Sequence, residues 1–161
     1  MKPLVVHYSF SGNTRMIAQA IAEAAGADIL ELRRADGGHA SGLSVFFKGG
    51  REAVAGAQPA LEPLSCNPAA YDFLFIGTPV WAFTYAPPLA TFFSTVPLTG
   101  KRIDLFCCHG GMKGRTFTAM KRALKGNDIA GEIDFRDPLK HDPAAQAGRA
   151  KEWARGLVSC L

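Results

Sequence analysis

The chain has 161 residues, 48% of them hydrophobic, and its 18 Lys and Arg exceed its 14 Asp and Glu to give a formal net charge of +4. This length and composition fit a single globular domain over residues 1–161. The basic residues are scattered, which argues against nucleic acid as a partner, and no apolar run reaches the about 18 residues that span a bilayer. We therefore expect a cytoplasmic protein without a membrane partner.

In chain order, short apolar runs alternate with helical patterns. The runs predict strands at residues 4–8, 28–32, 71–77, 103–108 and 129–135. Helices are predicted at residues 14–25, after Pro87-Pro88, at residues 115–124, and from Asp142-Pro143 onward. Pro suits the first turn of a helix and Asp suits its cap. The alternation is typical of βαβ units that form a parallel sheet.

The predicted strands differ in composition. Those containing VVHY, FLFI and LFCC are almost continuously apolar, as expected for central strands covered on both faces. DILEL and IAGEIDF carry charges, which edge strands tolerate. The sequence therefore predicts a doubly wound α/β fold with strand order 2-1-3-4-5 and helices on both faces. Ligands of such sheets bind beyond the carboxyl ends of the strands, near the switch between the first and third strands.

Residues 36–68 are the irregular part of the chain. A helix is predicted around Leu43 to Val54, although Gly49-Gly50 opposes it by on the order of 1 kcal/mol per glycine. We favour a crossover helix between the second and third strands. The other interpretation makes Phe46 and Phe47 part of a lid or a partner surface.

The polar stretch SFSGNT follows the first strand and opens the first helix. A helix N-terminus presents unpaired N–H groups and about half a positive charge, which suits a phosphate. Neither GxxxxGK[ST] nor GxGxxG is present, which disfavours a nucleoside triphosphate or a dinucleotide. Two interpretations therefore remain for this stretch. It either forms a site for one phosphate or is simply a well-capped helix start, and the residues concerned are Ser9, Ser11, Gly12, Asn13 and Thr14.

Two further loops leave the same predicted edge of the sheet. GTPVWAFTY follows the third strand, and its aromatic residues either fill the core or flank a planar ring. CHGGMKG follows the fourth strand, and its glycines either let the backbone approach a ligand or form a mobile loop. The three stretches together are more specific than any one of them.

Together these stretches resemble the flavodoxin family in their hydroxyl-rich loop, G-T-P-x-W loop and Gly-rich loop. The resemblance implies an FMN cofactor whose phosphate lies at Ser9, Ser11, Gly12, Asn13 and Thr14. It implies that the ribityl chain and isoalloxazine are bordered by Thr78, Pro79, Val80, Trp81, Ala82 and Phe83. The other edge of the ring would be lined by His109, Gly110 and Gly111. Trp81 and Phe83 are the candidates for stacking on the ring.

The sequence departs from that family in charge. Family carriers are usually acidic, whereas the three loops contain Arg15, Lys113 and Arg115 and no Asp or Glu. At an effective dielectric near 20, a unit charge about 8 Å away changes the energy of a charged flavin by roughly 2 kcal/mol. Basic surroundings therefore favour two-electron reduction. His109 also stands where the family often has an aromatic residue.

The resemblance leaves two uses for the flavin. One is an electron shuttle for a redox partner protein, and the other is reduction of a small acceptor such as a quinone by NAD(P)H. The basic loops favour the enzyme, whose nicotinamide site would require a dimer to complete it. A module that binds another small phosphate without flavin is the alternative.

The remaining candidates are read as structural. Cys107, Cys108 and His109 are adjacent in a strand, so their side chains alternate between faces and do not converge on a metal. We expect reduced thiols, because no CxxC pattern or disulfide framework is present. His7 is expected to pack in the core. No metal site and no catalytic side chain are predicted.

Overall fold

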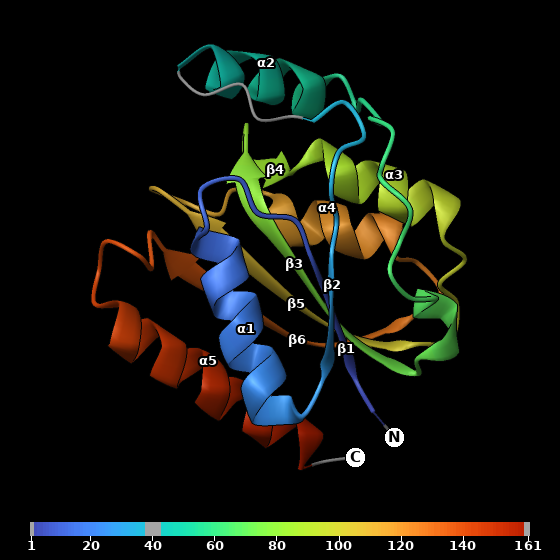
Figure 1. The fold of residues 1–161 in the computed structure, drawn as a ribbon, viewed down its shortest axis with the longest axis vertical. Coiled ribbons are helices and arrows are strands. Elements are labelled where there is room, and N and C mark those ends of the chain that lie inside the picture. Colours follow the sequence, from blue (N-terminus) through green and yellow to red (C-terminus); the bar gives the residue numbers. More distant parts are fainter. Residues whose placement is uncertain (1, 38–42, 160–161) are drawn as a thin grey trace.

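The computed structural model describes residues 2–37 and 43–159. Five parallel strands form the sheet in the order β2-β1-β3-β5-β6 (Figure 1). Their bounds are β1 Leu4–His7, β2 Asp28–Glu31, β3 Phe73–Trp81, β5 Arg102–His109 and β6 Asp128–Arg136. The predicted α/β class and the order of the five parallel strands are confirmed, since the additional short strand β4, Thr84–Tyr85, only changes the numbering.

Four helices cover the two faces of the sheet (Figure 1). One face carries α1, Asn13–Ala25, and α5, Pro143–Val158, and the other carries α3, Pro87–Thr95, and α4, Thr116–Ala123. Each lies where the sequence predicts a helix. Gly26 ends α1 in the left-handed conformation at φ 62°, and the Asp142 carboxylate caps α5 by accepting from the Ala145 N–H at 3.1 Å.

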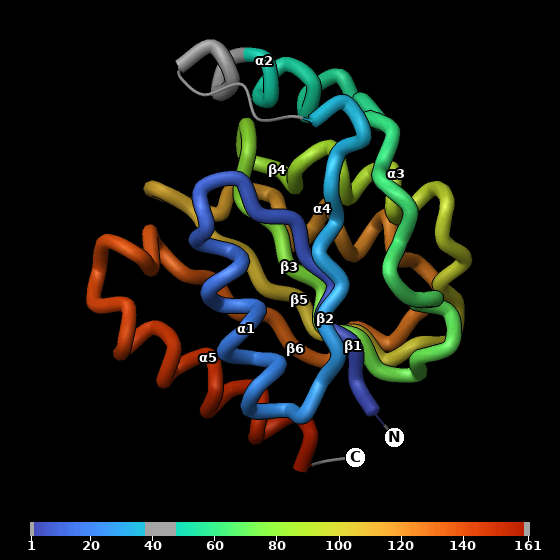
Figure 2. The backbone as a smooth tube through the Cα atoms, in the orientation of Figure 1, coloured from blue at the N-terminus to red at the C-terminus, as the bar shows by residue number. Residues whose placement is uncertain are grey.

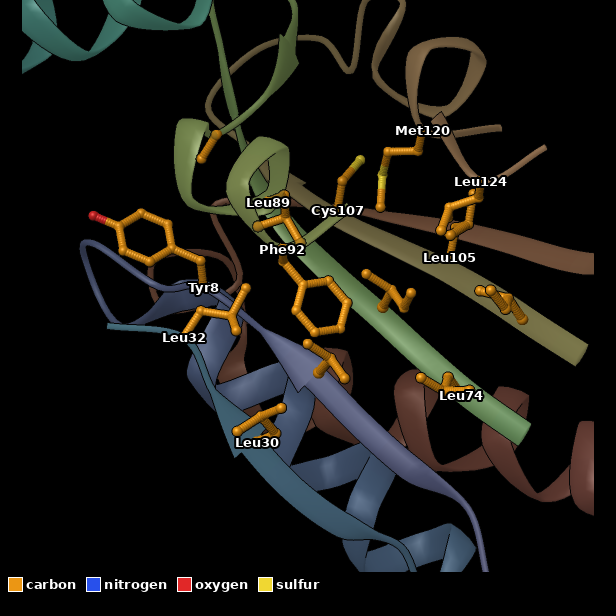
Figure 3. Close-up of a cluster of buried hydrophobic side chains, with 14 of the residues drawn as sticks. Tyr8, Leu30, Leu32, Leu74, Leu89, Phe92, Leu105, Cys107, Met120 and Leu124 are labelled. Atoms are coloured by element: carbon orange, nitrogen blue, oxygen red, sulfur yellow. The ribbon is translucent and has the colours of Figure 1, made fainter. Parts of the chain in front are cut away.

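The core consists of one cluster of buried side chains on each face. Residues of the α3 and α4 side are drawn in Figure 3, where Leu74, Leu105 and Cys107 point from the sheet towards Phe92 and Met120. The opposite cluster includes Phe75, Phe106 and Cys108 beneath α1 and α5. Burial of a large apolar side chain contributes about 1.5–3 kcal/mol, so these clusters hold the sheet that presents the loops.

The segment after Gly77 differs from its prediction as a loop. Thr78 and Pro79 continue β3 by pairing with Cys107 and Cys108 of β5. The chain then turns back into β4, so that Val80 and Trp81 pair with Tyr85 and Thr84. The loop prediction is therefore wrong for most of this stretch, because pairing with β5 overrides the local Gly and Pro signals.

The helix α2, Leu43–Val54, lies above the carboxyl ends of the strands rather than on a sheet face (Figure 1). A Cβ at Gly49 would lie 2.5 Å from the Trp81 ring, so only glycine allows this approach. The glycine pair that opposes helix formation thus fits α2 against the end of β3. From α2 the chain returns beside α3 (Figure 2), and its Leu61 and Leu64 cover the sheet there.

The crossover interpretation of residues 36–68 is right in chain order, but α2 covers the β3–β4 hairpin instead of the strands. A salt bridge of 2.8 Å between Arg34 and Glu52 connects α2 to the end of β2. The side chains of Phe46 and Phe47, which carry the lid interpretation, lie outside the described residues. In the parts of the chain that the structure describes, no helix is both long and apolar enough to cross a bilayer.

Candidate cofactor site

The loop between β1 and α1 is arranged by its own polar side chains. Ser9 Oγ accepts from the Arg15 N–H at 3.2 Å, and the Asn13 side-chain amide donates to Ser11 Oγ at 3.0 Å. Gly12 has φ 91° and its carbonyl accepts the first bond of α1 from Met16 at 3.0 Å. Gly12 therefore fits the turn that starts the helix, because a left-handed residue is required there.

The donors at this helix end are free to meet a ligand. No described residue accepts from the backbone N–H groups of Ser11, Gly12, Asn13 or Thr14. The Thr14 hydroxyl is buried, and the Cys108 thiol is the one described group placed to interact with it. Buried polar groups are rarely left unpaired, so this set of donors fits a bound anion such as a phosphate.

The charges below the loop are already engaged. Arg15 forms a 2.6 Å salt bridge with Glu31. Burial lowers the pKa of His7 to about 4, although Glu31 opposes the shift, so His7 is neutral at pH 7. His7 is a buried residue as predicted, with both ring nitrogens lacking a hydrogen-bond partner. A phosphate here would be held by neutral donors and the helix terminus.

A fourth segment, the turn at residues 137–142, was not predicted as part of the site. The Leu139 N–H donates to Asn13 Oδ1 at 3.0 Å, and the Asp137 N–H donates to the His109 carbonyl at 2.9 Å. Asp137 and Asp142 bound the turn with φ values of 36° and 52°. The turn follows the fifth parallel strand, so strand order alone could have placed it at this edge.

The β3–β4 hairpin brings Ala82 and Phe83 to its tip, with φ values of 48° and 64°. Such strained conformations in residues other than glycine cluster at functional sites. The Phe83 side chain is 58% exposed, and the Phe83 carbonyl accepts from the Arg115 N–H at 3.0 Å. A Cβ at Gly114 would lie 2.6 Å from Phe83 Cβ, so this loop closes tightly on the turn.

Trp81 occupies a different environment from Phe83. Its ring contacts Tyr8 and Phe10 edge to face, each with a centroid distance of 5.8 Å, and α2 covers it at Gly49. Between the two predicted stacking residues, the geometry therefore favours Phe83, whose ring is open to a ligand.

The other predicted residues of this stretch lie at the base of the hairpin. The Thr78 hydroxyl is buried, donating to the Pro79 carbonyl at 2.9 Å and accepting from the Ala86 N–H at 3.0 Å. It therefore holds the hairpin and has no hydrogen left to donate to a ligand. Pro79 and Val80 are half-buried beside it.

The loop after β5 contains a hydrogen-bonded cluster. His109 Nε2 lies 2.9 Å from Asp134 Oδ2, and Lys113 Nζ lies 2.8 Å from Asp134 Oδ1. Burial tends to raise the pKa of Asp134, but the hydrogen bonds from Lys113 and His109 hold it below its usual value. His109 is only 8% exposed in its side chain, and its Nδ1 has no hydrogen-bond partner.

Gly110 and Gly111 follow this cluster and are exposed. A Cβ at Gly110 would lie 3.6 Å from the Asp137 carboxylate, so the turn at residues 137–142 joins the β5 loop to the β1 loop. The structure thus brings Ser9 to Thr14 together with His109 and Gly110. Phe83 joins them through Gly114, whereas Trp81 and Thr78 pack inside.

The vicinal cysteines are structural, as predicted. Cys107 belongs to the core on the α3 and α4 side and Cys108 to the opposite core. Burial raises the pKa of Cys108 to about 12, so its thiol is unreactive at neutral pH. Over residues 2–37 and 43–159, no group of three or more His, Cys, Asp or Glu side chains is placed to hold a metal ion.

Comparisons with known proteins agree with this arrangement. The family model described as Flavodoxin matches residues 2–132. No curated protein matches the sequence. Solved structures with a similar fold include a Lactobacillus acidophilus flavoprotein in complex with FMN, which is 21% identical, with a TM-score of 0.71 and coverage of 89% of this chain and 98% of that one.

Two other solved structures are also similar. A flavoprotein from Bacteroides uniformis is 24% identical, with a TM-score of 0.78 and coverage of 94% of this chain and 96% of that one. The two-electron reduced flavodoxin of Megasphaera elsdenii is 21% identical, with a TM-score of 0.58 and coverage of 96% and 98%.

These structural likenesses establish the fold, and the family match extends from β1 into β6, across the loops that carry the predicted motifs. The resemblance seen in the hydroxyl-rich, G-T-P-x-W and Gly-rich loops is confirmed. The chain belongs to the flavodoxin family.

Proposed function

We propose that this protein binds FMN and transfers electrons to a redox partner protein or to a small acceptor. The observation that carries the proposal is the set of backbone N–H groups of residues 11–14, which no described residue accepts from at the start of α1, with the buried Thr14 hydroxyl beside them. Hydrogen bonds to a charged group contribute about 1.5–3 kcal/mol each, so several such donors suffice for tight binding of one phosphate.

The ring end of the site is supported by a second observation. Phe83 is exposed and held in a fixed turn by Gly114 and Arg115, and His109 ends the neighbouring strand β5. In this proposal Phe83 contacts the isoalloxazine, and His109, Gly110 and Gly111 border it. The flavin supplies the redox chemistry, and the chain's residues bind it, orient it and set its electrostatic surroundings.

The reduction of a quinone by NAD(P)H is the second candidate function. Arg115, which pairs with no described carboxylate, favours it, because an unpaired positive charge stabilises the negative charge that reduction adds to the flavin, whereas Arg15 and Lys113 are paired with Glu31 and Asp134. Such an enzyme would need a nicotinamide site, which we propose would be completed across a dimer.

The deciding experiment is the absorbance spectrum of the purified protein, followed by titration of the stripped protein with FMN. We expect a yellow protein that absorbs at about 450 nm and binds FMN more tightly than riboflavin. A colourless protein that binds no FMN at micromolar concentration, yet binds another small phosphate, would instead support the non-flavin module. Steady-state turnover with NADH or NADPH and a quinone then distinguishes the enzyme from the carrier.

A further inference from the structure

Exposed apolar side chains gather at the carboxyl edge of the sheet. Of the five exposed large hydrophobic residues in the described parts of the chain, three lie on loops at this edge: Phe83 at 58%, Met112 at 65% and Leu139 at 45% exposure. They come from the β3–β4 turn, the loop after β5 and the turn after β6. Exposed apolar residues concentrated in one region mark an interaction site.

Contacts between the loops show that these three residues belong to one continuous arc. Phe83 lies against Gly114, two residues after Met112. Gly110 borders Asp137, and Leu139 donates its N–H to Asn13 of the β1–α1 loop. The arc therefore runs from the hairpin tip to the candidate phosphate loop, along one side of the candidate flavin site.

The arc is held in place before any partner arrives. The Arg115 N–H bonds the Phe83 carbonyl at 3.0 Å, and the Leu139 N–H bonds Asn13 Oδ1 at 3.0 Å. Anchored backbones reduce the ordering entropy that an interface must overcome. The backbones at Phe83 and Leu139 are therefore fixed, and the Leu139 side chain lies against Gly12 of the β1–α1 loop while staying partly exposed.

Free positive charge accompanies the apolar residues. Arg115 and Lys140 are exposed, and no described carboxylate lies within ion-pair distance of either. The nearby carboxylates are engaged, since Asp134 pairs with Lys113 and His109, and Asp142 caps α5. Asp137 is the remaining acidic residue of the arc and is half-buried.

We infer that this arc is the docking surface for an acidic redox protein, an inference that rests on the proposed function. Met112 forms the centre of the contact, together with the exposed part of Leu139 and the part of Phe83 that the flavin leaves uncovered, and Arg115 and Lys140 attract the partner's carboxylates. An apolar centre with a charged rim is the usual anatomy of a protein interface. A small acceptor would stack on the ring alone, whereas the arc spans three separate loops beside it.

The test measures electron transfer from the reduced holoprotein by stopped flow. The absorbance spectrum of the flavin is first recorded, and the flavin is then reduced until this absorbance is lost. The reduced protein is mixed with oxidised rubredoxin as an acidic probe or with oxidised cytochrome c as a basic one. We expect the second-order rate constant with rubredoxin to fall at least about tenfold between low and high ionic strength, because salt screens the attraction. With cytochrome c it should rise or stay level.

Matched variants locate the surface. Arg115→Glu with Lys140→Glu should lower the rubredoxin rate constant at low salt about tenfold. Arg122→Glu with Lys125→Glu makes the same charge change on exposed residues at the far end of α4 and should leave the rate within about twofold. Met112→Ser should lower the rate at every salt concentration without changing the salt dependence.

Equal effects of the two double variants, or faster transfer to cytochrome c at low salt, would overturn the docking surface. A protein without a flavin spectrum would overturn the proposed function instead. In that case an NMR titration of the chain with rubredoxin decides the docking surface, since chemical-shift changes at Phe83, Met112 and Leu139 are expected and their absence refutes it.

Discussion

The two ends of the candidate site are built in different ways. At the phosphate end, six consecutive residues make a turn, bond to one another and to the Arg15 N–H through side chains, and leave N–H groups free at the start of α1. At the ring end, Gly114 fixes Phe83 and Gly49 covers Trp81. Each glycine is far in sequence from the ring that it contacts. The first end depends on local chemistry and the second on packing between loops, so the two should respond differently to substitution.

The largest expected effect breaks the phosphate end alone. Replacing both Ser11 and Thr14 with Ala removes two hydroxyl donors that would face a dianionic phosphate. Because hydrogen bonds to charged groups contribute about 1.5–3 kcal/mol each, we expect FMN affinity to fall about 100-fold or more. Riboflavin affinity should change less than about threefold, since it lacks the phosphate. Both are measured by fluorescence titration.

Thr91→Ala is the matched control, because Thr91 is another buried helical threonine, located in α3 with its hydroxyl bonded to Pro59. It should reduce stability, and any change in affinity should be the same for FMN and riboflavin. Equal losses for the two ligands in the double variant would show that these hydroxyls do not meet the phosphate.

The middle of the sheet separates effects on the site from effects on stability. Asp104 is fully buried in β5, where its carboxylate has no side-chain partner and lies beside the backbone of Gly131. Burial raises its pKa to about 6, although Arg102 opposes the shift. The folded state therefore favours the protonated form, and stability falls as pH rises from about 4 to about 6 and then stays level.

Asp104→Asn should consequently stabilise the protein by about 3 kcal/mol at pH 7 and above, and by little or nothing at pH 4. Urea unfolding at several pH values measures this difference. FMN affinity at pH 7 should not change, because Asp104 lies on the α5 side of the sheet, away from both ends of the site. A stabilisation that is the same at pH 4 and pH 7 would contradict the raised pKa.

A substitution at Gly114 breaks the ring end. Gly114 has φ 55°, and a Cβ there would meet the Phe83 backbone at 2.9–3.0 Å, so Ala forces the hairpin turn to move. We expect a loss of about 1–3 kcal/mol of stability. FMN and riboflavin should weaken together, because both contain the ring. Chemical unfolding and the same two titrations measure these effects.

Gly148→Ala in α5 is the control, since nothing lies within 4 Å of a Cβ at that position and its φ is not positive. It should leave both affinities unchanged and should not lower stability, because Ala favours a helix over Gly. If Gly114→Ala lowered the affinity for FMN but not for riboflavin, the ring end would affect phosphate binding, and the two ends could not be treated as separate.

The structure of the β1–α1 loop could be predicted from the sequence more fully than that of the β3–β4 hairpin, for a physical reason. The helix start, its hydroxyls and its glycine are adjacent in the chain, so their arrangement follows from local rules. Phe83 and Trp81 could not be told apart, because Gly49 and Gly114 decide which ring is covered. Gly77 and Pro79 predict a loop for the hairpin. The prediction is wrong because pairing with β5 outweighs these local signals.

The turn at residues 137–142 is the part of the site that no motif reveals. It contributes through its backbone, donating from Leu139 to Asn13 and from Asp137 to His109, and backbone donors carry no residue signature. Strand order alone brings it to the edge where the other loops end. The strand order is therefore the one sequence-based signal for this contact, since the turn carries no motif.

The smallest expected effect sharpens the comparison by cutting the link between the two ends. Asn13→Ala removes the acceptor for the Leu139 N–H, so the turn at residues 137–142 loses one of its two hydrogen bonds to neighbouring loops, and it also removes the amide that donates to Ser11 Oγ. A hydrogen bond of this kind contributes about 1 kcal/mol, which predicts about a fivefold loss of FMN affinity by fluorescence titration. Asn67→Ala removes a similar side-chain bond to a backbone N–H, far from the site, and should leave affinity unchanged. If both variants bound FMN equally well, the turn would hold no part of the site, and the two ends would be joined only through the sheet.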